Sequence, residues 1–184
     1  MGVDGDLLKQ YTMTTWGYKQ GESVSLMIHL GVRLGLYEAL DGAGPVTAGD
    51  LAAATGLHER WLREWLRSQA AAELMVSDEG ETFELQAEAA MVLARKGTPT
   101  YAGGVFSHLR NPKVADGLAE AFRTGLGLTY DGQGEGSEQH VEAMLAPMAR
   151  ALLVPRVIPA LDGVADRLVA GAKVVDVGCG TGLA

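Results

Sequence analysis

The residues best suited to chemistry stand at the end of the chain, in the run VVDVGCGTGLA that covers residues 174–184. Three valines interrupted only by Asp176 are typical of a parallel strand that is buried on both faces. Glycines follow at every second position, at 178, 180 and 182, and glycine lets backbone amides approach a ligand without a Cβ in the way. The run therefore predicts a buried strand that leads into a ligand-binding turn, with Asp176 at its carboxyl end.

The spacing of these glycines separates two classes of cofactor. The dinucleotide fingerprint G-x-G-x-x-G requires a third glycine at position 183, where this chain has Leu183. The observed pattern is D-x-G-x-G-x-G, and its acid suits a cationic or amine-bearing ligand better than a pyrophosphate. A glycine-rich turn without any ligand is the alternative interpretation.

At this motif the chain resembles the class I S-adenosylmethionine-dependent methyltransferases. The resemblance implies that the turn packs against S-adenosylmethionine and that Asp176 helps to orient the methionyl amino group of the cofactor. The cofactor-binding residues that it implies are Asp176, Gly178, Cys179, Gly180, Thr181 and Gly182. The catalytic base of related enzymes lies beyond the first motif, so no catalytic residue is assigned here.

Composition limits the other possibilities. With 184 residues, the chain has room for one globular domain, or for one domain and a fragment. The net charge of −8 argues against a general nucleic-acid-binding surface, and no apolar run reaches the roughly 18 residues of a membrane span. The single cysteine, Cys179, excludes an internal disulfide and agrees with a reducing cytoplasm. We expect it to be a small residue in a tight turn rather than a nucleophile, and no spacing typical of metal ligands is present.

Upstream of the motif the sequence predicts a mainly helical protein. A helix over residues 6–19 is expected to end at Gly21, and an apolar helix over residues 22–40 should bury one face. Thr47 and Asp50 are spaced as a capping box for a short helix that ends at Thr55. A second helix over 58–72 should bury a stripe formed by Trp61, Leu62, Trp65 and Leu66. Two short apolar runs around Asp78-Glu79-Gly80 then predict a hairpin.

Three helices followed by a hairpin make a winged helix, which we expect over about residues 24–86. Such a unit binds DNA in many proteins, and the second helix carries Arg60, Arg63 and Arg67, which could contact phosphates. Glutamates on the same helix and an acidic wing oppose this function. We therefore favour ion pairs between these arginines and glutamates, with the unit serving dimerisation and substrate capping. A winged-helix DNA-binding transcriptional regulator remains the alternative.

The resemblance extends over nearly the whole chain. Small-molecule methyltransferases commonly carry a helical, winged-helix-like N-terminal domain, and a bacterial group looks especially similar in "GLYEAL", "TAGDLAAATGLHERWLREWLRSQAAAEL" and "PALDGVADRLVAGAKVVDVGCGTG". These stretches indicate an architecture, and only the glycine motif is chemically specific.

Between the wing and the motif, helices are expected over 87–94, 99–110, 112–123 and 138–153, the last kinked or split at Pro147. The glycine-rich stretch 124–137 should be a loop. His29 is expected to be an interior residue and His58 a helix cap. His108 and His140 are the better candidates for contact with a substrate, whereas Tyr11, Met13, Trp16 and Tyr130 are more typical of a core than of a pocket.

These patterns predict a winged helix-turn-helix and a helical connecting region, and the resemblance implies that the first strand and glycine turn of a truncated Rossmann-like α/β domain follow. The expected boundaries are 1–95, 96–170 and 171–184. The function expected is that of the N-terminal portion of a cytoplasmic S-adenosylmethionine-dependent methyltransferase, a homodimer acting on a small-molecule methyl acceptor. Because a parallel strand needs a crossover before its neighbour can pair with it, the final strand should lack a sheet, and this chain alone should be inactive.

Overall fold

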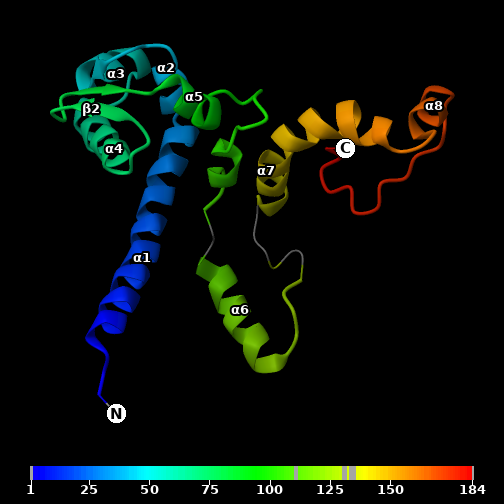
Figure 1. Ribbon diagram of the computed structural model, residues 1–184, viewed down its shortest axis with the longest axis horizontal. Helices are drawn as coiled ribbons and strands as arrows, with labels where there is room; N and C mark the ends of the chain where they lie inside the picture. The colour runs from blue at the N-terminus through cyan, green and yellow to red at the C-terminus, as the bar shows by residue number, and fades with distance from the viewer. Residues whose placement is uncertain (1, 110–111, 130–131, 133–135, 184) are drawn as a thin grey trace. The chain divides into compact units, whose positions relative to one another are not determined.

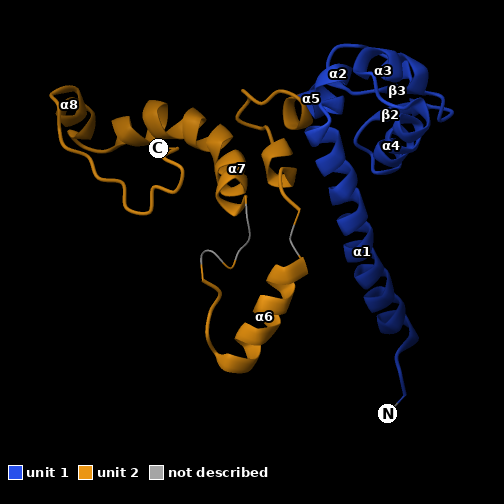
Figure 2. Ribbon diagram, turned by 180° about the vertical axis from the view of Figure 1, so that it is seen from behind, with its two compact units in different colours: residues 1–90 blue, residues 91–184 orange. Residues whose placement is uncertain are grey.

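The computed structural model describes residues 2–109, 112–129, 132 and 136–183 (Figure 1). The chain separates into two compact units, residues 1–90 and 91–184 (Figure 2). Both are mainly helical, as expected, and the first also holds a small sheet. None of the helices in the described part of the chain has the length and apolar character needed to cross a bilayer.

The first unit begins with a long helix, α1 (Gly5–Arg33), whose first turn is capped by the carboxylate of Asp4. The expected interruption at Gly21 is wrong, because α1 runs through that residue without a break. A glycine inside a helix costs about 1 kcal/mol, which the rest of a long helix can outweigh. The break comes instead at Gly35, whose φ of 69° lies in the left-handed region, and α2 (Leu36–Leu40) follows it.

The next two helices form the helix-turn-helix. The capping box is confirmed at the start of α3 (Ala48–Thr55), where Thr47 Oγ1 accepts from the amide of Asp50 and the Asp50 carboxylate accepts from the amide of Thr47. Gly56 ends this helix in a left-handed conformation. His58 caps α4 (Glu59–Ala71), as expected, with Nδ1 accepting from the amide of Arg60 at 3.2 Å.

The wing is a hairpin of β2 (Val76–Asp78) and β3 (Thr82–Glu84), with Glu79 and Gly80 at positive φ in its turn. This confirms the expected hairpin. A third strand, β1 (Val46–Thr47), was not predicted from the sequence and pairs antiparallel with β3, so that the sheet order is β1-β3-β2. A strand of two residues is too short to show the alternation of apolar and polar residues by which a strand is recognised in a sequence. It pairs with the edge of β3 that β2 leaves unpaired.

The core of the first unit lies where α1, α2, α3 and α4 meet. Tyr37 and Gln69 are fully buried there, and the Tyr37 hydroxyl donates to Gln69 Oε1. Trp65 packs edge-on against Tyr37 and donates its indole N–H to the carbonyl of Met27 in α1 at 2.9 Å. The expected stripe on α4 is buried except for Trp61, whose side chain is 74% exposed.

The second unit is described from the end of α5 (Ala87–Leu93), which spans the division between the units. The expected helix over 99–110 is reduced to one 3₁₀ turn, η1 (Gly103–Phe106), and Arg110 lies outside the described residues. It is followed by α6 (Pro112–Thr124) and α7 (Ser137–Leu152), and Figure 1 shows that α7 bends along its length, as Pro147 predicts. The chain then passes through a π-helical turn η3 (Leu153–Val157), a 3₁₀ turn η4 (Ile158–Ala160) and α8 (Val164–Val169).

Candidate functional site

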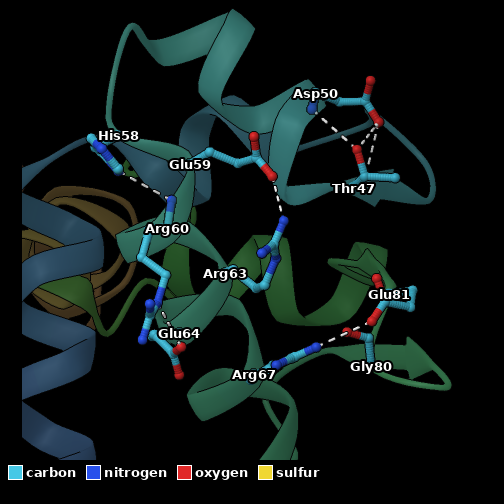
Figure 3. A network of polar contacts seen from close by, with 10 residues as sticks. All are labelled: Thr47, Asp50, His58, Glu59, Arg60, Arg63, Glu64, Arg67, Gly80 and Glu81. Atoms are coloured by element: carbon cyan, nitrogen blue, oxygen red, sulfur yellow. Dashed lines mark hydrogen bonds and ion pairs between the residues drawn. The ribbon is translucent and has the colours of Figure 1, made fainter.

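The three arginines of α4 are engaged by acids rather than presented to solvent as free cations (Figure 3). Arg60 pairs with Glu64 at 3.2 Å, and Arg63 pairs with Glu59. The third arginine reaches the wing: Arg67 pairs with the Glu81 carboxylate at 3.1 Å and donates to the carbonyl of Gly80 at 3.3 Å. The expected ion pairs are therefore confirmed.

These pairs weaken the case for DNA binding. The helix α4 and the wing carry the three arginines against six carboxylates, at positions 59, 64, 78, 79, 81 and 84. A surface that must follow a phosphate backbone needs net positive potential, since neutralised phosphates supply most of the affinity. The exposed pairs themselves contribute little stability, about 0–1 kcal/mol each.

The predicted cofactor turn has the backbone that its glycines permit. Gly178, Gly180 and Gly182 have φ values of 79°, 55° and 82°. A hydrogen bond of 2.8 Å from the amide of Gly182 to the carbonyl of Cys179 closes the turn. A side chain added at any of the three glycines would meet no atom within 4 Å, so the left-handed backbone, and not local crowding, is what requires glycine here.

The strand expected before this turn is not formed. Val174, Val175 and Val177 lie in a segment without regular secondary structure, and their side chains are largely exposed. A strand is defined by its ladder of hydrogen bonds, and the sheet in the described part of the chain belongs to the first unit. The exposure of these valines agrees with the expectation that this segment has no sheet to join.

A second group of polar residues converges in the second unit, and it contains both histidines favoured from the sequence. The rings of His108 and His140 have centroids 5.8 Å apart and planes tilted by 41°. Ser107 Oγ and His140 Nδ1 lie 3.2 Å apart, within hydrogen-bond distance. A cleft of about 540 Å³ is lined by Ser107, His108, Gly136, Gln139, His140 and Ala143, and we call it the histidine cleft.

A close backbone contact sets the geometry of the histidine cleft. The turn η1 packs against α7, and a Cβ at Gly104 would overlap the carbonyl oxygen of Ala143. Only glycine therefore allows the segment that carries Ser107 and His108 to approach the helix that carries His140. Ser107 was not singled out from the sequence, because no local pattern links positions that are 33 residues apart.

The electrostatics of the cleft favour a neutral imidazole. Partial burial lowers the pKa of His140, and the neighbouring His108 lowers it further because two positive charges would repel. A neutral imidazole has one nitrogen that donates a hydrogen bond and one that accepts it. His140 is thus suited to bind a polar group at neutral pH without adding a charge.

The other residues considered from the sequence lie elsewhere. His29 is buried in the core, as expected. Tyr11, Met13 and Trp16 are exposed on α1, so neither a pocket nor a core contains them. Tyr130 lies outside the described residues. Among the described residues, no cluster of three or more histidine, cysteine or acidic side chains could hold a metal ion.

Comparison with known proteins identifies the first unit. Residues 22–95 match the family model of the Rv2258c-like winged HTH domain. Over these residues the chain has the helix-turn-helix and the wing of such a domain. The match ends at residue 95, shortly after α5. No curated protein matches the chain.

Solved structures of methyltransferases are similar over most of the chain. The mitomycin 7-O-methyltransferase MmcR is 28% identical, with a TM-score of 0.57 over 82% of this chain and 44% of its own. The N,N-8-amino-8-demethyl-D-riboflavin dimethyltransferase RosA from Streptomyces davawensis is 24% identical, with a TM-score of 0.53 over 82% and 45%. Human N-acetylserotonin methyltransferase, in complex with SAM, shares the fold at 18% identity and a TM-score of 0.60, over 89% and 51%.

The chain thus spans less than half the length of MmcR and RosA. The winged helix-turn-helix domain and these structures confirm the resemblance to the N-terminal part of an S-adenosylmethionine-dependent small-molecule methyltransferase.

Proposed function

We propose that this chain is the N-terminal part of an enzyme that transfers a methyl group from S-adenosylmethionine to a small molecule. The observation that carries the proposal is the similarity to MmcR over 82% of the chain. The motif that follows Lys173 supports it independently, because its acid and three spaced glycines suit this cofactor. In this proposal the first domain ends at residue 95, a connecting region covers residues 96–170, and the cofactor-binding domain begins at residue 171. The protein would work in the cytoplasm.

The cofactor site we propose consists of Asp176 and the turn from Gly178 to Gly182, with Cys179, Gly180 and Thr181 between them. The positive φ values and the open space around the glycines fit a ligand that packs directly on the backbone. The exposed carboxylate of Asp176 would hold the methionyl amino group. When bound, S-adenosylmethionine would supply an electrophilic methyl group on a sulfonium, and the chain's contribution is to position it in line with the acceptor.

Calorimetry with S-adenosylmethionine tests this proposal. We expect the protein extended beyond Ala184 to bind the cofactor and residues 1–184 alone to bind it negligibly, since the segment before the turn forms no strand in this chain. Asp176→Asn in the extended protein should weaken binding about tenfold, which is the loss of about 1.4 kcal/mol expected of a charge-assisted hydrogen bond. Asp162→Asn, the same change at another exposed acid of the second unit, is the matched control and should bind normally. Equal affinity of the two variants would refute the role of Asp176.

We also propose that the protein is a homodimer in which α1 takes part. The helix is 29 residues long, yet its buried residues are confined to Ile28, His29 and Gly31. The preceding turns expose large apolar and aromatic side chains on a helix that extends away from the rest of its unit (Figure 1), at Leu7, Leu8, Tyr11, Met13, Trp16 and Tyr18. Isolated helices are marginal in water, so a partner that covers these side chains would stabilise the helix.

Sedimentation equilibrium of two tryptophan variants tests the dimer. Trp16 on α1 and Trp61 on α4 are 68% and 74% exposed, so their replacement by alanine removes similar surface. Trp16→Ala should raise the dimer dissociation constant at least tenfold, because aromatic side chains dominate interface energies, whereas Trp61→Ala should leave it unchanged. A monomeric wild-type protein would refute the proposal.

A further inference from the structure

Two segments of the second unit pack closely together, and each of them carries a histidine. The turn η1 packs against α7, and a Cβ added at Gly104 would overlap the carbonyl oxygen of Ala143. His108 follows Gly104 by four residues. His140 precedes Ala143 by three residues, so both lie on the same face of α7. A close approach of two backbones therefore holds together the segments from which the two imidazole rings project.

The two rings lie where a positive charge is unfavourable. Their centroids are 5.8 Å apart, and Ser107 Oγ lies 3.2 Å from His140 Nδ1. A Cβ added at Gly136, the residue before the first turn of α7, would lie 3.5 Å from His108 Nδ1. Both histidines thus stand at the N-terminal end of α7, which carries a partial positive charge. A proton on either ring is opposed by this helix end and by a proton on the other ring.

Few other charges surround the rings in the described part of the chain. Glu138 and Glu142 of α7 each stand two positions from His140, about 200° around the helix, so they lie on another face. The turn η1 is formed by uncharged residues, and His108 is the titratable group of the segment that follows it. The turn η3, at the far end of α7, contributes Arg156. Three further charged residues lie outside the described residues, namely Arg110, Asp131 and Glu135.

This arrangement makes the packing of η1 on α7 depend on pH. Partial burial lowers the pKa of His140 below its ordinary 6.5, and the neighbouring His108 lowers it further. In an open, solvated state the pKa of His140 would return towards 6.5, so the open state binds protons more readily. The closed contact therefore keeps its full stability above about pH 6.5 and loses it as the pH falls towards the lower pKa of the closed state. Within this range the opening equilibrium constant rises by up to about tenfold for each pH unit, since the open state binds one more proton.

We propose that His108 and His140 form a pH-dependent contact, which holds η1 against α7 when the rings are neutral and releases it in mildly acidic solution. The approach of Gly104 to Ala143 keeps the two segments together, so opening this approach relieves the repulsion between the rings. Ser107, His108 and His140 also line the histidine cleft, and opening the contact would separate its two sides. The contact is independent of cofactor binding and of the proposed function.

Hydrogen exchange of residues 1–184, followed by mass spectrometry at about pH 7.5 and about pH 5.5, tests the proposal. Dividing the rates by those of unprotected amides at each pH gives protection factors. Peptides that cover residues 103–109 and 137–146 should lose protection about two- to tenfold at the lower pH. Peptides from α3 and α4 in the first unit are the internal control and should keep their protection. Unchanged protection of the two segments, or no protection of them at about pH 7.5, would overturn the proposal.

Histidine variants separate a titrating contact from a merely structural one. His140→Asn keeps a polar side chain that does not titrate in this range, so protection of the two segments should no longer fall between the two pH values. His108→Asn removes the neighbouring charge and should make the fall smaller. The matched control is His58→Asn on α4, where asparagine is also a good helix cap, and it should leave the fall unchanged. A fall in His140→Asn as large as in the wild type would contradict the role of the histidines.

A proton NMR titration of the His140 ring decides the case in which both variants open the contact at every pH. The ring signal is assigned by its loss in His140→Asn. In the wild type it should titrate below 6.5, and in His108→Asn its midpoint should move up towards that value. A wild-type midpoint at or above 6.5 would overturn the proposal.

Discussion

Replacing Gly31 by alanine should destabilise the winged helix-turn-helix domain by a packing cost that the structure defines. A Cβ at this position would lie 2.6 Å from a ring carbon of Trp65 and 2.6 Å from one of Tyr37. Both rings lie in the core. Trp65 packs edge-on against Tyr37 and donates a hydrogen bond to the carbonyl of Met27. Both side chains are buried, so relieving these contacts requires the rings or α1 to shift within a packed core.

The magnitude follows from a comparison within the same helix. Overpacking a well-filled core costs about 1–3 kcal/mol. Alanine at a helical position gains about 1 kcal/mol over glycine through backbone entropy. Gly21→Ala makes the same chemical change in α1 where nothing lies within 4 Å of the new Cβ, so it carries the gain without the clash. The difference between the two variants therefore isolates the packing cost of about 1–3 kcal/mol.

Urea unfolding of residues 1–184 followed by tryptophan fluorescence measures this difference, since Trp65 reports on the core. We expect Gly21→Ala to unfold at the same urea concentration as the wild type or a higher one, and Gly31→Ala at a lower one. In a thermal scan the separation should be roughly 4–8 °C for each kcal/mol in a domain of this size. If Gly31→Ala proves as stable as Gly21→Ala, the close contact of α1 with Trp65 and Tyr37 is wrong.

Two further changes, with one control, test the capping box and the buried polar pair. Thr47→Ala should cost about 0.5–2 kcal/mol of unfolding free energy, measured by urea titration, because it removes the cap of α3. The hydrogen bonds from the side chain and backbone of Thr47 lower the pKa of Asp50 below its ordinary 3.8. Asp50 therefore stabilises the fold above that value and loses its contribution as the pH falls through the lower folded-state pKa, so acid titration of Thr47→Ala should show a smaller loss of stability in this range. Tyr37→Phe should cost about 1–3 kcal/mol by leaving the buried oxygen of Gln69 without its donor, while Tyr18→Phe, on the exposed part of α1, should be neutral in the same assay.

Features encoded by neighbouring residues were predictable from the sequence. The capping box at Thr47, the histidine cap at His58 and the left-handed turn at Gly80 each depend on residues within four positions of one another. The ion pairs of Arg60 and Arg63 also follow from helical spacing. Hydrogen bonds and ion pairs of this kind can be predicted from the sequence, since the partners are close to one another along the chain before it folds.

Features that depend on the whole fold were not predictable in the same way. Gly21 and Gly35 are the same residue type in one apolar stretch, and only the packing of α2 on α1 shows that the second must take a positive φ. Trp61 and Trp65 stand one helical turn apart, yet Trp65 is buried and donates a hydrogen bond to α1, whereas Trp61 is exposed. The strand over residues 174–177 depends on partner strands, so its valines could indicate a strand that this chain does not form.

The same difference between local and long-range features applies to the candidate functional residues. Asp176 and the glycines were found because a ligand turn is a contiguous motif. His108 and His140 were chosen as single residues, and the sequence contained no sign that they share a cleft or that Ser107 joins them. The signal that could have linked them is Gly104, a small residue at a place where two backbones must approach, but its meaning emerges only with α7 in place.

The long helix α1 is packed against the rest of its unit near its C-terminal end, where its buried residues lie. Near one end, the carbonyl of Met27 accepts a hydrogen bond from the Trp65 indole and Gly31 lies against two rings, whereas the residues of α1 from Gly5 to Ser23 are exposed. With a rise of 1.5 Å per residue, the free arm from Met27 to Gly5 is about 33 Å long. A rotation of about 10° at the Trp65 contact would therefore displace the tip by about 6 Å. A small change in the packing of α1 against α4 therefore becomes a displacement of several ångströms at the N-terminal end of the helix.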